Sequence, residues 1–227
     1  MVKVKLLEEK KDRVTLHIQE SDNAYMNALR RLMMEEVPTL AIEEVVFKKN
    51  NGILYDEIVA HRLGLLALKT DAGSYNLQTE CKCKGEGCAQ CTLKLTIKAE
   101  GPGYVYASDI RSKDPKCKPV HGKTPVTKLL QGQEIEAEMT AKMGIGRVHA
   151  KWSPCLAYYK HAPHVVIKKQ PQDPDFVAER CPTKVFEVKQ GQLRVADENA
   201  CIWCGECMEL TNDDVHVRRE NDYLFYI

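Results

Sequence analysis

The spacing of hydrophobic and polar positions along the chain predicts a mixed α+β fold. Apolar residues recur at helical intervals from Ser21 to Val37, and Pro38 follows, which predicts one amphipathic helix. The apolar stripe of this helix covers roughly half of its circumference, which is more than one sheet needs. The helix therefore either packs only on its own sheet or also contacts another subunit.

Several other segments have the alternation and the β-branched content of strands. We expect strands over residues 2–8, 13–20, 40–47, 92–100, 104–110, 134–139, 156–168 and 223–227, and a second helix over 56–68. Changes in pattern divide the chain into a discontinuous domain (1–70 and 141–170), a β-rich insert (71–140), a cysteine-bearing unit (171–217) and a return strand (218–227).

Composition narrows the class of protein. With 44% hydrophobic and 29% charged residues, no run of eighteen apolar residues and no signal-peptide start, we expect a cytoplasmic globular protein without membrane contact. The formal net charge is only +1, so the overall charge does not indicate binding to nucleic acid. A zinc-dependent nucleic-acid binder using Lys113 to Lys128 is an alternative, but a solvated basic loop explains these lysines more simply.

Ten cysteines in a cytoplasmic chain favour metal binding over disulfides, and four of them predict an iron-sulfur cluster. Cys201, Cys204 and Cys207 have the C-x2-C-x2-C spacing that places three thiolates around a cluster, and Cys181 precedes a proline. Residues 176–217 thus resemble the dicluster ferredoxin family with one cluster lost. We expect a 4Fe-4S cluster, or 3Fe-4S if Cys181 does not ligate, and zinc bound by the same thiolates is the alternative.

The second group, Cys81, Cys83, Cys88 and Cys91, has a spacing like that of a zinc knuckle. Four thiolates would close the coordination sphere of a zinc ion and make the site structural. Disulfides in an oxidised sample, or a loop without metal, are the alternatives.

Several motifs in order resemble the family of archaeal DNA-directed RNA polymerase D subunits, which is related to the third-largest subunit of eukaryotic RNA polymerase II and to the bacterial alpha subunit. They are Asn27 to Arg31, Val37 to Ile42, Leu54 to Glu57, His61 to Leu63, Ala99 to Gly103 and Gly144 to Pro154. The resemblance covers nearly the whole chain. It implies an alpha-subunit-type dimerisation domain that carries the two cysteine-bearing inserts.

The resemblance also implies a function. A member of this family is a non-catalytic assembly subunit that pairs with subunit L and, with subunits N and P, forms the platform for the large catalytic subunits. It places Asn27, Leu29, Arg30 and Arg31 at the interface with L, and His149, Lys151 and Trp152 toward the platform. Nucleotidyl transfer would belong to the whole complex, and we expect no catalytic residue and no sequence-specific nucleic-acid contact in this subunit.

Two further expectations complete the prediction. Members of the family usually continue past the last strand into a helix that pairs with L, so this sequence is either cut short or pairs through a smaller interface. A ferredoxin-like electron carrier or redox sensor is the alternative function, although the sequence has no flavin or nicotinamide motif.

Overall fold

A computed structural model describes residues 2–227, which form two compact units. Of the described residues, the first unit contains 2–30 and 157–227, and the second contains 31–156. No helix among the described residues is both long enough and apolar enough to cross a bilayer.

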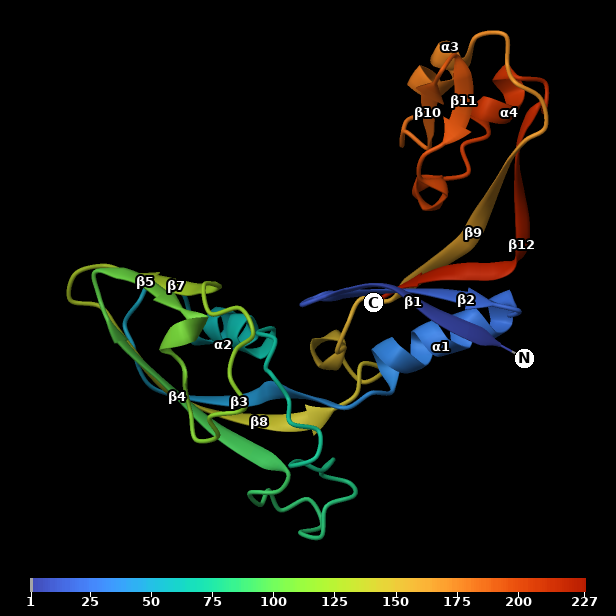
Figure 1. The fold of residues 1–227 in the computed structure, drawn as a ribbon. Helices are drawn as coiled ribbons and strands as arrows, with labels where there is room; N and C mark the ends of the chain where they lie inside the picture. Colours follow the sequence, from blue (N-terminus) through green and yellow to red (C-terminus); the bar gives the residue numbers. More distant parts are fainter. Residues whose placement is uncertain (1) are drawn as a thin grey trace. The chain divides into compact units, whose positions relative to one another are not determined.

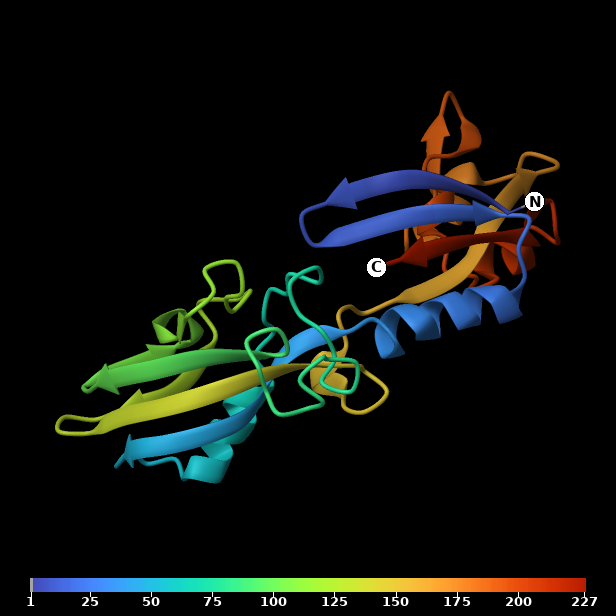
Figure 2. The same cartoon turned by 90° about the horizontal axis from the view of Figure 1, so that it is seen from below.

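The first unit contains a four-stranded antiparallel sheet. Its order is β1 (Lys3–Lys10), β2 (Arg13–Gln19), β12 (Val215–Tyr226) and β9 (Tyr158–Ile167), and it can be followed by colour in Figure 2. Ile18, Leu224 and Phe225 are buried in it. The alternation of Val14, Leu16 and Ile18 predicted strand β2, in which Ile18 is buried and Val14 and Leu16 are partly buried.

Helix α1 (Asn23–Glu35) follows β2 and is the helix predicted from the apolar stripe. The backbone N–H of Tyr25 donates to Asp22 Oδ1 at 2.8 Å, which caps the first turn. Met26 is fully buried, but Tyr25 and Leu32 are 50% and 54% exposed. Part of the apolar stripe is therefore not covered by the described residues.

A small module is inserted between β9 and β12. Beyond an irregularity between Arg219 and Tyr223, these two strands continue as a paired ribbon that leads to the module (Figure 1). The module consists of α3 (Pro174–Arg180), β10 (Phe186–Lys189), β11 (Gln192–Val195), a short 3-10 turn (Glu198–Ala200) and α4 (Glu206–Leu210). Its own apolar core includes Val177, Phe186 and Leu193.

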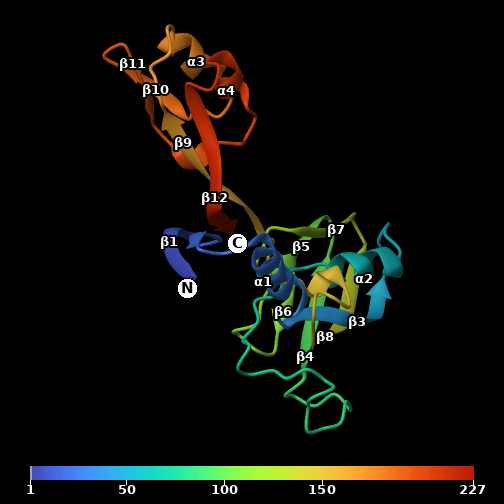
Figure 3. The same cartoon turned by 90° about the vertical axis from the view of Figure 1, so that its right-hand side faces the viewer.

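The second unit is built on another antiparallel sheet, in the order β3 (Thr39–Asn50), β8 (Glu134–Gly144), β4 (Thr92–Glu100) and β6 (Arg111–Ser112). Strands β5 (Gly103–Tyr106) and β7 (Pro125–Leu129) form a separate pair. Helix α2 (Asp56–Gly64) contacts both β3 and β7 (Figure 3). The core between these elements is made of aliphatic residues such as Leu63, Leu95 and Met139.

Some elements differ from the sequence prediction. Helix α2 ends at Gly64 rather than at residue 68, and the strand expected over 104–110 ends at Tyr106. There the carboxylate of Asp109 accepts from the backbone N–H of Tyr106 at 2.8 Å and turns residues 107–109 into a 3-10 helix. Strand β3 pairs with β8, and β8 pairs with β4 in the same sheet. The division of the chain into four segments stays a prediction.

Candidate metal centres and partner-binding residues

The four cysteines before β4 bring their sulfur atoms together. All four Sγ atoms lie within 4.8 Å of one another. The measured separations are 3.4 Å for Cys81 to Cys83, 3.5 Å for Cys81 to Cys88, 3.6 Å for Cys83 to Cys91 and 3.9 Å for Cys88 to Cys91. A zinc ion with Zn–S bonds of about 2.3 Å separates its tetrahedral ligands by about 3.8 Å. The four thiols therefore fit one tetrahedral metal ion.

Backbone geometry and hydrogen bonds prepare this loop for thiolates. Gly85 and Gly87 have φ values of +90° and +89°, a conformation that favours glycine and lets the chain fold back between the ligand pairs. The backbone N–H of Cys88 lowers the pKa of Cys83 to about 5, whereas burial raises the pKa of Cys91 to about 12. Ionising all four thiols in one place requires a cation, which a bound metal supplies.

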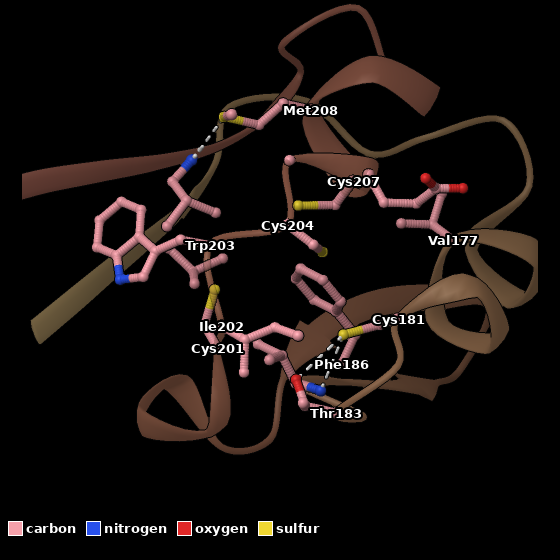
Figure 4. Close-up of a pocket in the computed structure, with 15 residues that line it drawn as sticks. Val177, Cys181, Thr183, Phe186, Cys201, Ile202, Trp203, Cys204, Cys207 and Met208 are labelled. Atoms are coloured by element: carbon pink, nitrogen blue, oxygen red, sulfur yellow. Dashed lines mark hydrogen bonds between the residues drawn. The ribbon is translucent and has the colours of Figure 1, made fainter. Parts of the chain in front are cut away.

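The second cysteine group lines a cavity in the module (Figure 4). Cys181, Cys201, Cys204 and Cys207 surround this space, together with apolar side chains that include Val177, Phe186, Ile202 and Met208. Among residues 2–227, no three of these four thiols have sulfur atoms mutually within 4.8 Å. A single ion cannot reach thiolates spread in this way, whereas the irons of a cluster each bind a different cysteine. The cavity and its donor set therefore fit an iron-sulfur cluster better than a zinc ion.

The loop from Cys201 to Cys207 has the backbone turns that a chain needs to place three thiols around one cluster. Trp203 and Gly205 have φ values of +63° and +82°, and one such residue lies in each interval between cysteines. The backbone N–H of Val185 donates to the sulfur of Cys181 at 3.3 Å, which orients the remote fourth thiol. Burial, followed by the nearby Cys201, Cys204 and Cys181, raises the pKa of Cys207 to about 11. As in the first group, the four thiolates need a cationic centre between them.

The cysteine loop is attached to strand β9. The indole N–H of Trp203 donates to the carbonyl of His161 at 3.3 Å, and the Lys160 ammonium donates to the carbonyls of Asn199 and Cys201 at 2.5 and 3.0 Å. Sequence reasoning missed Lys160, because one lysine in an alternating strand gives no signal of its own. A cluster held by this loop is thus linked directly to the sheet of the first unit.

The residues predicted to contact subunit L lie on α1. Asn27 and Arg31 are exposed, and Leu29 and Arg30 are partly buried. Asn27 Oδ1 accepts from the Arg30 guanidinium at 3.0 Å, and Arg31 pairs with Glu35 at 3.1 Å one turn later. These contacts are local to the helix, and the predicted contact with L stays a prediction.

The three residues predicted to face the platform differ in exposure and in the contacts that they make. His149 is exposed, and Lys151 forms an ion pair with Glu43 and donates to the carbonyl of Ile42 at 3.1 Å. Trp152 is only 8% exposed, and its indole N–H donates to the carbonyl of Lys142 at 3.1 Å. Of the three residues, His149 is therefore the most exposed, although its Nδ1 accepts from the backbone N–H of Lys151 at 3.1 Å.

We expect Trp152→Ala to destabilise the second unit strongly. Removing a buried large aromatic side chain costs about 3–5 kcal/mol. Urea unfolding monitored by circular dichroism measures this change, with Val148→Ala as the exposed control that should lie within about 0.5 kcal/mol of the parent. Equal stability of the two variants would contradict the buried role of Trp152.

Comparison with known proteins agrees with this architecture. Residues 41–154 match the family model described as the RNA polymerase Rpb3/RpoA insert domain. The matched region covers nearly all of the second unit, from β3 through the cysteine loop to Trp152. It places the chain in the class of proteins that carry this insert domain.

Full-length relatives identify the family. The DNA-directed RNA polymerase subunit Rpo3 of Methanosphaera stadtmanae is 34% identical over 99% of this chain and 87% of its own length, and that of Archaeoglobus fulgidus is 36% identical over 100% and 87%. The DNA-directed RNA polymerase II subunit rpb3 of Dictyostelium discoideum is 33% identical over 98% and 83%. The chain belongs to the Rpo3/Rpb3 family of DNA-directed RNA polymerase subunits, which confirms the family predicted from the sequence.

Proposed function

We propose that this chain pairs with the small polymerase subunit L through α1 and that the pair, with subunits N and P, forms the platform on which the large catalytic subunits assemble. As a member of its family, it is a non-catalytic assembly subunit that serves transcription, and nucleotidyl transfer belongs to the complete polymerase. Family membership does not favour the ferredoxin-like alternative. The observation that carries the pairing proposal is the exposed apolar stripe on α1, which includes Tyr25 and Leu32 two turns apart.

We expect Leu32→Asp to weaken pairing with subunit L at least tenfold. Burying a leucine side chain contributes about 1.5–3 kcal/mol, and a factor of ten corresponds to about 1.4 kcal/mol. The affinity is measured by isothermal titration of separately purified subunits. Ile58→Asp is the matched control, because Ile58 is an exposed apolar residue on α2. A folded Leu32→Asp variant that binds L as tightly as the control would contradict the proposal.

We further propose one zinc ion in the first cysteine group and one iron-sulfur cluster in the second. The tetrahedral sulfur spacing supports zinc, and the wider sulfur spacing around the module cavity supports the cluster. A bound cluster would supply a cationic centre that is able to change its charge by one electron. The chain's own residues position the four thiolates and exclude water with the apolar cavity lining.

The proposed role of both groups is to hold structure rather than to carry electrons. The cluster loop is attached to β9, which is itself an edge strand of the sheet of the first unit, so the cluster would stabilise the connection between the module and that sheet. We also propose a cytoplasmic location, because reducing conditions keep cysteine thiols available as ligands.

A further inference from the structure

Two histidines and two carboxylates meet where the ribbon leaves the sheet of the first unit. Asp222 on β12 is only 5% exposed. His17 on β2 donates from Nε2 to Asp222 Oδ2 at 3.0 Å, and His164 on β9 donates from Nε2 to Asp222 Oδ1 at 2.9 Å. The Oε2 atom of Glu220 lies 3.9 Å from the same Nε2 of His164. Neither cysteine group uses any of these residues.

The register of the strands brings these groups together. The pairing of β12 with β9 shifts between Arg219 and Tyr223, and Glu220 and Asp222 are two residues apart within this irregular segment. The candidate ligand atoms of His164, Glu220 and Asp222 all lie within 4.8 Å of one another. The other oxygen of Glu220, Oε1, lies 3.5 Å from Nε of Arg218, so Oε2 is the oxygen directed at His164.

We propose that His164, Glu220 and Asp222 bind a first-row divalent cation, such as Zn²⁺, through one imidazole nitrogen and one oxygen from each carboxylate. Metal–ligand bonds of about 2.0–2.1 Å separate tetrahedral ligands by about 3.3 Å. The observed separations from His164 Nε2, 2.9 Å to Asp222 and 3.9 Å to Glu220, lie on either side of this value. Small side-chain movements, together with transfer of the Nε2 proton of His164 to Nδ1 or to water, therefore admit the ion.

His17 has a separate role in this site. Its Nε2–H donates to the buried carboxylate of Asp222 rather than facing the ion, and a hydrogen bond of this kind orients a ligating carboxylate. The side chain of Glu220 is 52% exposed, which leaves an entry path for the ion and a coordination position for water. The site would connect β9 to β12 independently of the assembly role.

Another histidine and carboxylate pair in the same unit provides the comparison. His216 Nδ1 lies 3.2 Å from Asp213 Oδ1, at an exposed position. No third candidate ligand within residues 2–227 completes a group around this pair. A single pair of this kind binds a divalent cation weakly, so Asp213→Asn serves as the matched control.

The test uses the holoprotein with both cysteine groups already loaded. Co²⁺ is the probe, because thiolate ligation to Co²⁺ gives strong near-ultraviolet charge-transfer bands that nitrogen and oxygen ligands do not give. Anaerobic equilibrium dialysis should find one additional Co²⁺ per chain without those bands. We expect Glu220→Gln and His17→Gln each to weaken this binding at least tenfold, and Asp213→Asn to leave it unchanged.

Three results would overturn the proposal. They are the absence of saturable Co²⁺ uptake by the parent protein, thiolate charge-transfer bands on the added Co²⁺, or equal affinity in the parent and in Glu220→Gln. Because Glu220 is exposed, its substitution leaves the fold intact, and the circular dichroism spectrum verifies this before the titration.

Discussion

Cys204→Ser is expected to remove the cluster, to unfold residues 176–217 and to weaken pairing with subunit L. Cys204 is exposed, so the substitution removes little packing and its effect should come from the lost ligand. The module has only a small apolar core, and a domain of this size depends on a bound metal centre for much of its stability. Iron and labile sulfide analysis of anaerobically purified protein, limited proteolysis and titration with L measure the three effects.

Leu210→Ser is the matched control, since Leu210 is an exposed residue of the same module that lies outside the cavity lining. The parent and this control should contain about four irons with sulfide and about one zinc per chain. A Cys204→Ser variant that loses iron but pairs normally with L would remove the link between cluster and assembly. Zinc without sulfide in the parent would refute the cluster itself.

Cys91→Ser is expected to release the zinc ion and to leave residues 71–91 open to proteases. Structural zinc contributes about 10–16 kcal/mol of binding free energy at pH 7 in zinc-finger peptides, so loss of one thiolate has a large local effect. The sheet that follows should survive, because Leu95 and Met139 remain packed in the core of the second unit. Zinc analysis and mapping of the cleavage sites measure the result.

Cys155→Ser controls for loss of a thiol in the same unit. Cys155 lies outside both cysteine groups, and its sulfur is 3.9 Å from the carbonyl oxygen of Met33. This variant should keep its zinc and its resistance to cleavage. If Cys91→Ser retained as much zinc as Cys155→Ser, the proposed ligand set would be wrong.

A strand that buries one face and exposes the other could be predicted from the sequence alone. The strand expected over residues 92–100 is β4 with the same bounds, since Leu93, Leu95 and Ile97 alternate with exposed neighbours. Cys81 to Cys91 and Cys201 to Cys207 were predictable as groups, because the cysteines within each loop are close in sequence. The different spacing of the sulfur atoms in the two groups, on which the proposals of one ion and of a cluster depend, became visible only in three dimensions.

Features that depend on pairing between distant strands could not be predicted. The sequence predicted a strand only over residues 223–227, but β12 begins at Val215. The earlier part of β12 is mostly polar, and it is a strand because it pairs with β9. The meeting of His17, His164 and Asp222 likewise requires the register of three strands. Each of these residues alone looks like an ordinary surface residue of a strand.

The pairing of β9 with β12 indicates that the sheet of the first unit would tolerate deletion of the whole module. Ile167 lies opposite Val215, and the backbone N–H of Lys168 donates to the carbonyl of Asp214 at 2.8 Å, so the module enters and leaves at one point. In topology, residues 168–214 occupy the position of a hairpin loop. Loop-closure entropy changes slowly with loop length, so a short turn in their place would keep the same strand register. We therefore expect a chain with a short turn in place of residues 168–214 to keep the sheet beneath the module unchanged.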